Sequence, residues 1–151
     1  RIMICAAEDV SNADPQALVV ATAASQAVMQ LGMPEARIIL AQAATYVACA
    51  PKSNSAIMAI DGAMEFVKAH PDYKIPSYLQ DAHYKGAAKL GHGIGYKYAH
   101  DYKNHYARQQ YLPDACKDIH FYNLSEQGYE KRLKEHLTRI HRESEEDNGG
   151  Q

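Results

Sequence analysis

The sequence predicts an all-α protein built as a bundle of long helices, and three observations support this fold class. Apolar residues recur at helical spacing in three runs between residues 15 and 70. These runs are rich in alanine, whose small side chain lets the axes of neighbouring helices approach closely. The turns between the runs are short, which favours antiparallel neighbours. A chain of 151 residues with 46% hydrophobic residues suits one domain with a hydrophobic core.

Prolines and a glycine divide the first part of the chain. Residues 1–8 are predicted to be the end of a helix, which the stretch at 12–15 breaks. Asp14 can cap the next helix, and Pro15 suits its first position because proline lacks the N–H that would be unpaired there. This helix is expected to end at Leu31, since Gly32 favours a left-handed C-terminal conformation.

Two further helices are predicted at residues 34–50 and 54–69. Pro34 and Pro51 bound the earlier of these two helices, and the pair His70-Pro71 ends the later one. The helix at 34–50 is apolar around most of its circumference. Such a helix is buried, either within its own domain or against a partner.

The second half of the chain has a different composition, because ten of the eleven tyrosines lie between Tyr73 and Tyr129. We expect a connector at 71–81, a short helix at 82–90, an irregular Gly- and Tyr-rich segment at 91–113 packed on the bundle, and an extended stretch at 121–124. Ser125 is expected to cap a last helix. The predicted domain covers residues 1–142, and the acidic tail at 143–151 is expected to be disordered. Because the chain starts at Arg1, we expect it to be a fragment of a longer protein.

Positive charge is concentrated in the middle of the chain. The net charge is −2, but residues 74–117 carry seven Lys and Arg against three Asp. Tyrosines alternate with these cations, a mixture that can hold phosphates and stack bases. The same mixture can form a polar protein interface, or a solvated rim over packed rings. The candidate residues for DNA binding or for an interface are Lys52, Lys85, Lys89, Lys97, Lys103, Arg108, Tyr96 and Tyr98.

No catalytic or metal-binding residue is predicted. The glycines at 91, 93 and 95 lack the spacing of a phosphate-binding loop. The pair His100-Asp101 is typical of metal-dependent HD-type phosphohydrolases, which makes a helical phosphohydrolase an alternative function, but that chemistry needs further ligands from other helices. We expect His100, Asp101, Gln109 and Gln110 to hold the loop in place instead. The three cysteines show no CxxC spacing and predict neither a disulfide framework nor a zinc site.

Several blocks of sequence resemble the C-terminal region of the RarA/MgsA family of replication-associated AAA+ ATPases, which are relatives of the Werner-helicase-interacting protein. In the first half the blocks are Glu8-Asp9-Val10-x-Asn12-Ala13-Asp14-Pro15, Leu31-Gly32-Met33-Pro34-Glu35, Leu40-Ala41-Gln42-Ala43 and Ala50-Pro51-Lys52-Ser53-Asn54. In the second half they are Gly95-Tyr96-Lys97-Tyr98-Ala99-His100-Asp101-Tyr102, Gln109-Gln110-Tyr111-Leu112-Pro113 and Phe121-Tyr122. The resemblance covers nearly the whole chain in order and ends at about Arg142.

This resemblance implies a function that cannot be inferred from the spacing of residues. It implies a helical domain similar to the clamp-loader collar, which assembles a DNA-dependent AAA+ ATPase into a homotetramer at stalled replication forks. ATP and Mg would be bound by a motor domain outside this chain, which has no Walker motif, so this fragment is expected to be non-enzymatic and to hold no cofactor. The implied partners are further copies of the chain, single-stranded or forked DNA and single-strand-binding protein, with no membrane. A bacterial, cytoplasmic location at the nucleoid or fork is expected, and a pure protein-interaction module remains an alternative.

Overall fold

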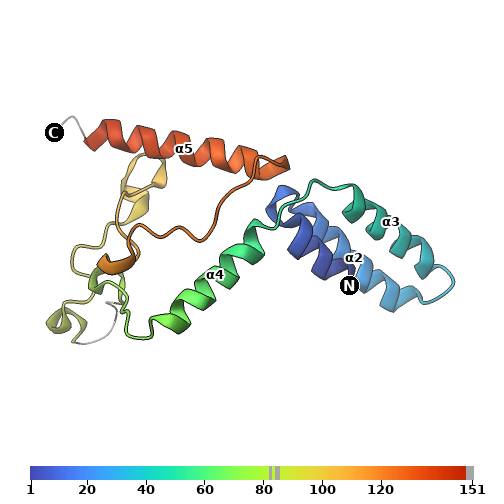
Figure 1. The fold of residues 1–151 in the computed structure, drawn as a ribbon, viewed down its shortest axis with the longest axis horizontal. Helices are drawn as coiled ribbons and strands as arrows, with labels where there is room; N and C mark the ends of the chain where they lie inside the picture. The colour runs from blue at the N-terminus through green and yellow to red at the C-terminus, as the bar shows by residue number, and fades with distance from the viewer. Residues whose placement is uncertain (82, 84–85, 149–151) are drawn as a thin grey trace. The chain divides into compact units, whose positions relative to one another are not determined.

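The computed structural model describes residues 1–81, 83 and 86–148, and Figure 1 shows the path of the chain. Its helices are α1 (Ile2–Cys5), α2 (Gln16–Leu31), α3 (Ala36–Cys49), α4 (Ser55–Ala69) and α5 (Gly128–Asn148). The remaining described segments are short helical turns and irregular backbone, without a β-strand among these residues. The prediction of an all-α protein is therefore confirmed.

The chain forms two compact units, where the sequence predicts one domain. The first unit comprises residues 1–64 and 121–136, and the second comprises residues 65–120 with the part of α5 that follows His136. The boundaries fall inside α4 and α5, so two continuous helices each contribute to both units.

The first unit is built on the antiparallel pair α2 and α3, which lie side by side in Figure 1. The buried core contains mostly small side chains: Ala6, Val10, Ala17, Ala21, Val47 and Ala50, with Ile2 and Cys5 packed against them. Alanine at these positions allows the close approach of helices that the sequence predicts.

Local signals place the ends of α2 and α3 as predicted. The carboxylate of Asp14 accepts a hydrogen bond from the backbone N–H of Gln16 at 3.1 Å, at the start of α2. Gly32 follows the last residue of α2 with a φ of 67°, which glycine adopts without a steric penalty. The helix α3 ends at Cys49, just before Pro51.

The second unit is mostly irregular. The helix predicted at 82–90 is a 3-10 turn at Ala87–Leu90, and residues 82, 84 and 85 lie outside the described residues. The following glycines, Gly91, Gly93 and Gly95, all have positive φ angles, which accounts for the tight loop that they form. Among the described residues of this unit, further 3-10 turns lie at Ser77–Leu79, Ala99–Asp101, Lys103–His105 and Asp114–Cys116.

The last helix differs from its prediction at both ends. It begins at Gly128, three residues after Ser125, and it continues through residues 143–148, which the sequence assigned to the disordered tail. Glu143 and Glu145 are held by contacts with the irregular segment, described below, so this end of the helix has tertiary support. Residues 149–151 lie outside the described part of the chain. Across the described residues, α5 and the other helices lack the combination of length and apolar composition that crossing a membrane requires.

Candidate functional site

Three of the predicted cations come together in the second unit. Lys97, Lys103 and Arg108 line a small cavity of about 70 Å³, together with Tyr102 and Tyr106 among others. The two parts of the chain that carry these cations lie against each other, because the Lys97 ammonium donates a hydrogen bond to the carbonyl oxygen of Arg108 at 3.3 Å. We call Lys97, Lys103 and Arg108 the basic cluster. Three positive charges around one cavity form a site suited to an anionic ligand.

Two glutamines hold the backbone around the basic cluster. The Gln109 side-chain amide donates to the carbonyl oxygen of Lys97 at 3.4 Å and to the hydroxyl of Tyr111 at 3.1 Å. The Gln110 amide donates to the carbonyl oxygen of Leu112 and to the carboxylate of Asp114, both at 2.8 Å, and its own backbone carbonyl accepts a hydrogen bond from the Tyr78 hydroxyl. These bonds are consistent with the loop-holding role expected for both glutamines.

The other predicted residues of this segment lie at its surface. The ring of His100 packs between those of Tyr98 and His105, at centroid distances of 5.1 and 4.9 Å. Tyr96 and Tyr98 are 54% and 55% exposed, so their faces are accessible to a ligand. Lys89 and Asp101 are exposed and do not line the small cavity, and Lys85 lies outside the described residues. The described residues contain no group of three or more His, Cys, Asp or Glu side chains that could hold a metal ion.

The acidic end of α5 contacts the segment that carries the basic cluster. Asn104 donates a hydrogen bond to a carboxylate oxygen of Glu143 at 2.8 Å, and Arg108 forms an ion pair with Glu145 at 3.1 Å. The rings of Tyr106 and His141 also lie 5.2 Å apart. The pKa of Glu143 is lowered by the hydrogen bond from Asn104 and by the positive charges of Lys103, Arg139 and Arg142, which together outweigh burial. A low pKa means that this carboxylate is ionised and faces the basic cluster as an anion.

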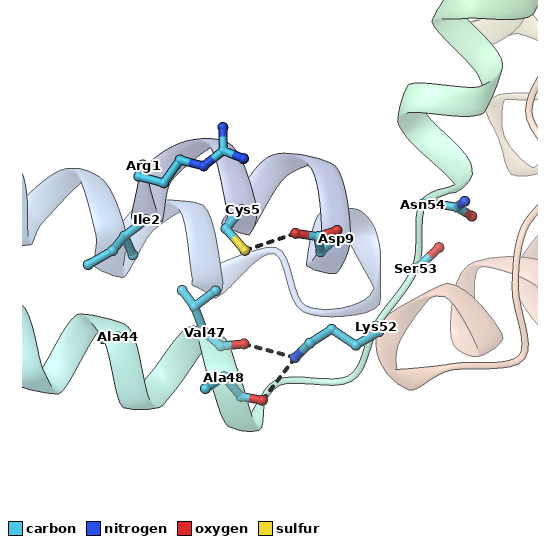
Figure 2. A pocket seen from close by; sticks show the side chains of 10 residues that line it. All are labelled: Arg1, Ile2, Cys5, Asp9, Ala44, Val47, Ala48, Lys52, Ser53 and Asn54. Atoms are coloured by element: carbon cyan, nitrogen blue, oxygen red, sulfur yellow. Dashed lines mark hydrogen bonds between the residues drawn. The ribbon is translucent and has the colours of Figure 1, made fainter.

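Lys52 lies in the first unit, where it lines an open cavity of about 630 Å³ (Figure 2). Its ammonium donates hydrogen bonds to the carbonyl oxygens of Val47, Ala48 and Ala50 at 2.9, 3.0 and 2.6 Å. An ammonium has three N–H donors, so all of them are directed at the C-terminal end of α3. This geometry makes Lys52 a helix-capping residue, favoured there by the negative end of the helix dipole.

The same cavity contains the thiol of Cys5. The thiol donates a hydrogen bond to the Asp9 carboxylate at 2.8 Å, and this bond, with burial and the negative charge of Asp9, raises the thiol pKa above its usual value. A protonated thiol is a weak nucleophile. The raised pKa of this thiol does not suit a cysteine-dependent catalytic site. The cavity is instead a candidate binding surface.

The most buried charge in the described residues is Glu130, near the start of α5, whose exposure is 0%. One carboxylate oxygen accepts hydrogen bonds from the Ser53 hydroxyl at 2.8 Å and the Ser125 backbone N–H at 2.9 Å, and the other accepts one from the Tyr122 hydroxyl at 2.9 Å. Burial raises the pKa of this carboxyl, but the hydrogen bonds from Ser125, Ser53 and Tyr122 outweigh burial and lower the pKa below its usual value. Asn12 extends the network by donating to the Tyr122 hydroxyl at 3.0 Å. We call this set of side chains the Glu130 network.

Glu130 is not among the site residues predicted from the sequence, although one signal for it is present. Glu130 lies three residues before Leu133, seven before Leu137 and ten before Ile140, so it occupies the apolar stripe of the last helix. An acid in an apolar stripe is buried only where hydrogen bonds satisfy it. Those partners come from distant parts of the chain, which the spacing of residues does not reveal.

The blocks of sequence that carry the family resemblance meet at the Glu130 network. Asn12, Ser53 and Tyr122 belong to three different blocks and all take part in it. Gly128 lies two residues before Glu130, at a position too tight for any larger residue. A Cβ atom there would lie 2.1 Å from the carbonyl oxygen of Ala13 and 2.9 Å from Pro51. The shared blocks therefore include the residues that join the start of α5 to the first unit.

Comparison with known proteins decides the family. The sequence pattern described as the C-terminal domain of the MgsA AAA+ ATPase matches residues 1–141. The chain belongs to the MgsA AAA+ ATPase C-terminal family. The predicted resemblance is thereby confirmed, and the match ends close to Arg142, where the resemblance was expected to end.

Relatives of this MgsA-type domain occur in bacteria and in a eukaryote. Replication-associated recombination protein A of Bacillus subtilis is 46% identical over 136 residues, which are 89% of this chain and 32% of that protein. The Escherichia coli protein of the same name is 38% identical over 139 residues, 91% of this chain and 31% of that protein. The ATPase WRNIP1 of Dictyostelium discoideum is 36% identical over 123 residues, 81% of this chain and 14% of that protein. The chain thus spans about a third of the length of the Bacillus subtilis and Escherichia coli relatives.

Proposed function

We propose that this MgsA-type domain assembles a DNA-dependent, replication-associated AAA+ ATPase into a homotetramer that acts at stalled forks. Two of the relatives are called replication-associated recombination proteins, and the family is that of an AAA+ ATPase C-terminal domain. In this proposal ATP and Mg are bound by the motor domain of the whole protein, and the present domain is non-catalytic. The whole protein would work in the cytoplasm, with single-strand-binding protein as a further partner.

The exposure of α3 is the observation that carries the assembly proposal. The sequence requires this apolar helix to be buried by its own domain or by a partner, and its own unit buries only Ala36, Ala43 and Val47 among the described residues. Ile38 on its opposite side is 63% exposed. An exposed apolar side chain of this size on the outer side of α3 is available to a partner.

Exposed apolar side chains continue from α3 around the turn that joins it to α2. Met29 and Met33 are 77% and 71% exposed, and Leu31 between them is 59% exposed. We call Met29, Leu31, Met33 and Ile38 the apolar tip. Next to it, a cavity of about 210 Å³ is lined by Ala24, Val28 and Leu40, among others, and offers a recess for a side chain of another copy. We assign the subunit contact to this surface.

Replacing both Met29 and Met33 by glutamate is expected to dissociate the tetramer. Burying a carboxylate without a partner costs several kcal/mol per site, and in a symmetric assembly the cost is repeated at every copy of the interface. Light scattering after size exclusion would then give the mass of one or two chains. The control is Ile94→Glu, at a 66% exposed apolar residue of the irregular segment, which should leave the mass unchanged. Equal masses for the wild type and the double variant would refute the assignment of the apolar tip.

We further propose that the basic cluster contacts the phosphates of single-stranded or forked DNA. The cluster supplies three cations around one cavity, and the exposed rings of Tyr96 and Tyr98 in the same segment can stack on bases. We also assign a phosphate contact to Lys89, an exposed lysine in the 3-10 turn at Ala87–Leu90.

Reversing two charges of the basic cluster tests this contact. Lys97→Glu with Lys103→Glu is expected to weaken binding of single-stranded DNA by about tenfold or more at low salt, because two phosphate contacts are replaced by repulsion. The salt dependence of binding should also become shallower. The control is Lys68→Glu with Lys131→Glu, which makes the same change in net charge at exposed lysines outside the cluster. An equal loss of affinity in both double variants would mean that net charge, and not the basic cluster, determines binding.

A further inference from the structure

The chain itself contains groups that compete with DNA phosphates for the contacts proposed above. The two carboxylates at the end of α5 already occupy donors of the segment that carries the basic cluster. The Glu145 carboxylate forms an ion pair with the Arg108 guanidinium at 3.1 Å, and the Glu143 carboxylate accepts a hydrogen bond from the Asn104 side-chain amide at 2.8 Å. Both Asn104 and Arg108 line the same small cavity as Lys97 and Lys103.

A carboxylate and a phosphate bind these donors in the same way. A guanidinium presents its N–H groups to the two oxygens of a carboxylate or to two oxygens of a phosphate, and an amide N–H donates to either. Lys103 lies close enough to Glu143 to help lower its pKa, so the electrostatic field of the cluster acts on an anion that the chain supplies. The cavity is therefore lined by donors that suit a phosphate. Two of these donors, on Asn104 and Arg108, already bind glutamate oxygens.

The contact is suited to exchange. The side chains of Arg108 and Glu145 are 59% and 60% exposed, and an exposed ion pair changes an equilibrium constant by a factor of only about two to five. A polyanion that offers several phosphates at once can displace such a pair, because it adds further contacts and releases its own counterions. A buried pair would resist that exchange.

We propose that the carboxylates of Glu143 and Glu145 occupy the positions of two DNA phosphates, so that the acidic end of α5 is an intramolecular competitor of single-stranded DNA for the basic cluster. This inference rests on the proposed DNA contact and adds its regulation. DNA binding detaches the end of α5 from the segment at 104–108. The affinity of the site is then set by the competition between these two glutamates and the phosphates.

The test measures the affinity of the intact protein for a short fluorescein-labelled oligothymidylate by fluorescence anisotropy at several salt concentrations. Glu143→Gln with Glu145→Gln keeps the size of both side chains and removes both charges, and it should tighten binding by about five- to tenfold at low salt. Glu8→Gln with Glu135→Gln makes the same charge change at two exposed acids of the first unit, and it should alter affinity by less than about twofold.

The outcomes separate this inference from the proposed DNA contact. If the wild type binds the oligonucleotide and the Glu143/Glu145 variant binds no more tightly, the competition is refuted while the DNA contact stands. If the control pair tightens binding as much as the Glu143/Glu145 pair, net charge accounts for the effect and the competition is again refuted. If no variant and no wild-type protein binds at low salt, both proposals fail. Tighter binding confined to the Glu143/Glu145 variant supports both.

Discussion

Replacing Gly128 by alanine is expected to destabilise the protein by about 3 kcal/mol or more. Gly128 is the first residue of α5, and its φ of 52° is already a conformation that other residues rarely adopt. A Cβ atom there would lie 2.1 Å from the carbonyl oxygen of Ala13 and 2.9 Å from the Pro51 ring. Backbone cannot yield by the required distance without separating the start of α5 from Ala13 and Pro51, so the cost of overpacking adds to the cost of the dihedral angle. Urea denaturation followed by circular dichroism measures the loss.

Two other glycines serve as controls for Gly128. Gly91 has a φ of 73° and open space around its Cβ position, so Gly91→Ala should cost only the dihedral term of about 1–2 kcal/mol. Gly62 lies within α4, and a Cβ there meets Phe121 at an ordinary 3.8 Å, so Gly62→Ala should stabilise by roughly 0.5–1 kcal/mol. A Gly128→Ala variant no less stable than Gly91→Ala would show that α5 does not approach Ala13 as closely as described.

Removing the buried carboxylate of Glu130 is expected to cause a second large loss of stability. Glu130→Ala should destabilise the protein by about 3–5 kcal/mol, because the Ser53 hydroxyl, the Ser125 N–H and the Tyr122 hydroxyl lose their acceptor inside the protein. Glu130→Gln keeps the shape but places an N–H₂ group against donors, so a smaller loss of about 2 kcal/mol is expected. Glu135→Gln changes an exposed acid on the same helix and should leave stability within about 0.5 kcal/mol of the wild type.

The pH dependence of stability isolates the charge of Glu130. Its pKa in the folded protein is lowered from the usual 4.5, so its contribution to stability is fully present above that value. The contribution is lost as the pH falls below 4.5 and through the lower pKa of the folded state. The difference in free energy of unfolding between wild type and Glu130→Gln should therefore shrink as the pH falls from neutral to below 4.5. A difference that stays constant over this range would show that Glu130 is not ionised in the folded protein.

The helices of the first unit could be predicted because their boundaries depend on nearby residues. Asp14, Gly32 and Pro51 act within one or two residues of a helix end, and the observed ends of α2 and α3 agree with them. The largely apolar character of α3 was also visible, but whether its own domain or a partner buries it depends on the packed structure. The exposure of Ile38 is what favours a partner.

The candidate sites could be predicted only in part, since they depend on long-range contacts. The chain separation between Asn12 and Tyr122 is 110 residues and between Ser53 and Glu130 it is 77 residues, so no local pattern points to the Glu130 network. Lys52 has the charge of a phosphate ligand, but its position after α3 directs it to three carbonyl oxygens. The composition of residues 143–148 suggests disorder, whereas Glu143 and Glu145 find partners 39 and 37 residues away. Lys97, Lys103 and Arg108 of the basic segment line one cavity, while their role in binding stays a prediction.

The mass of this chain in solution tests the central claim, which is assembly through an exposed apolar surface. Light scattering coupled to size exclusion should give four times the 16.8 kDa of one chain, with dissociation only on dilution. The double variant at Met29 and Met33 should shift that mass downward in the same buffer. A single species of 16.8 kDa at every concentration would contradict assembly through the apolar tip.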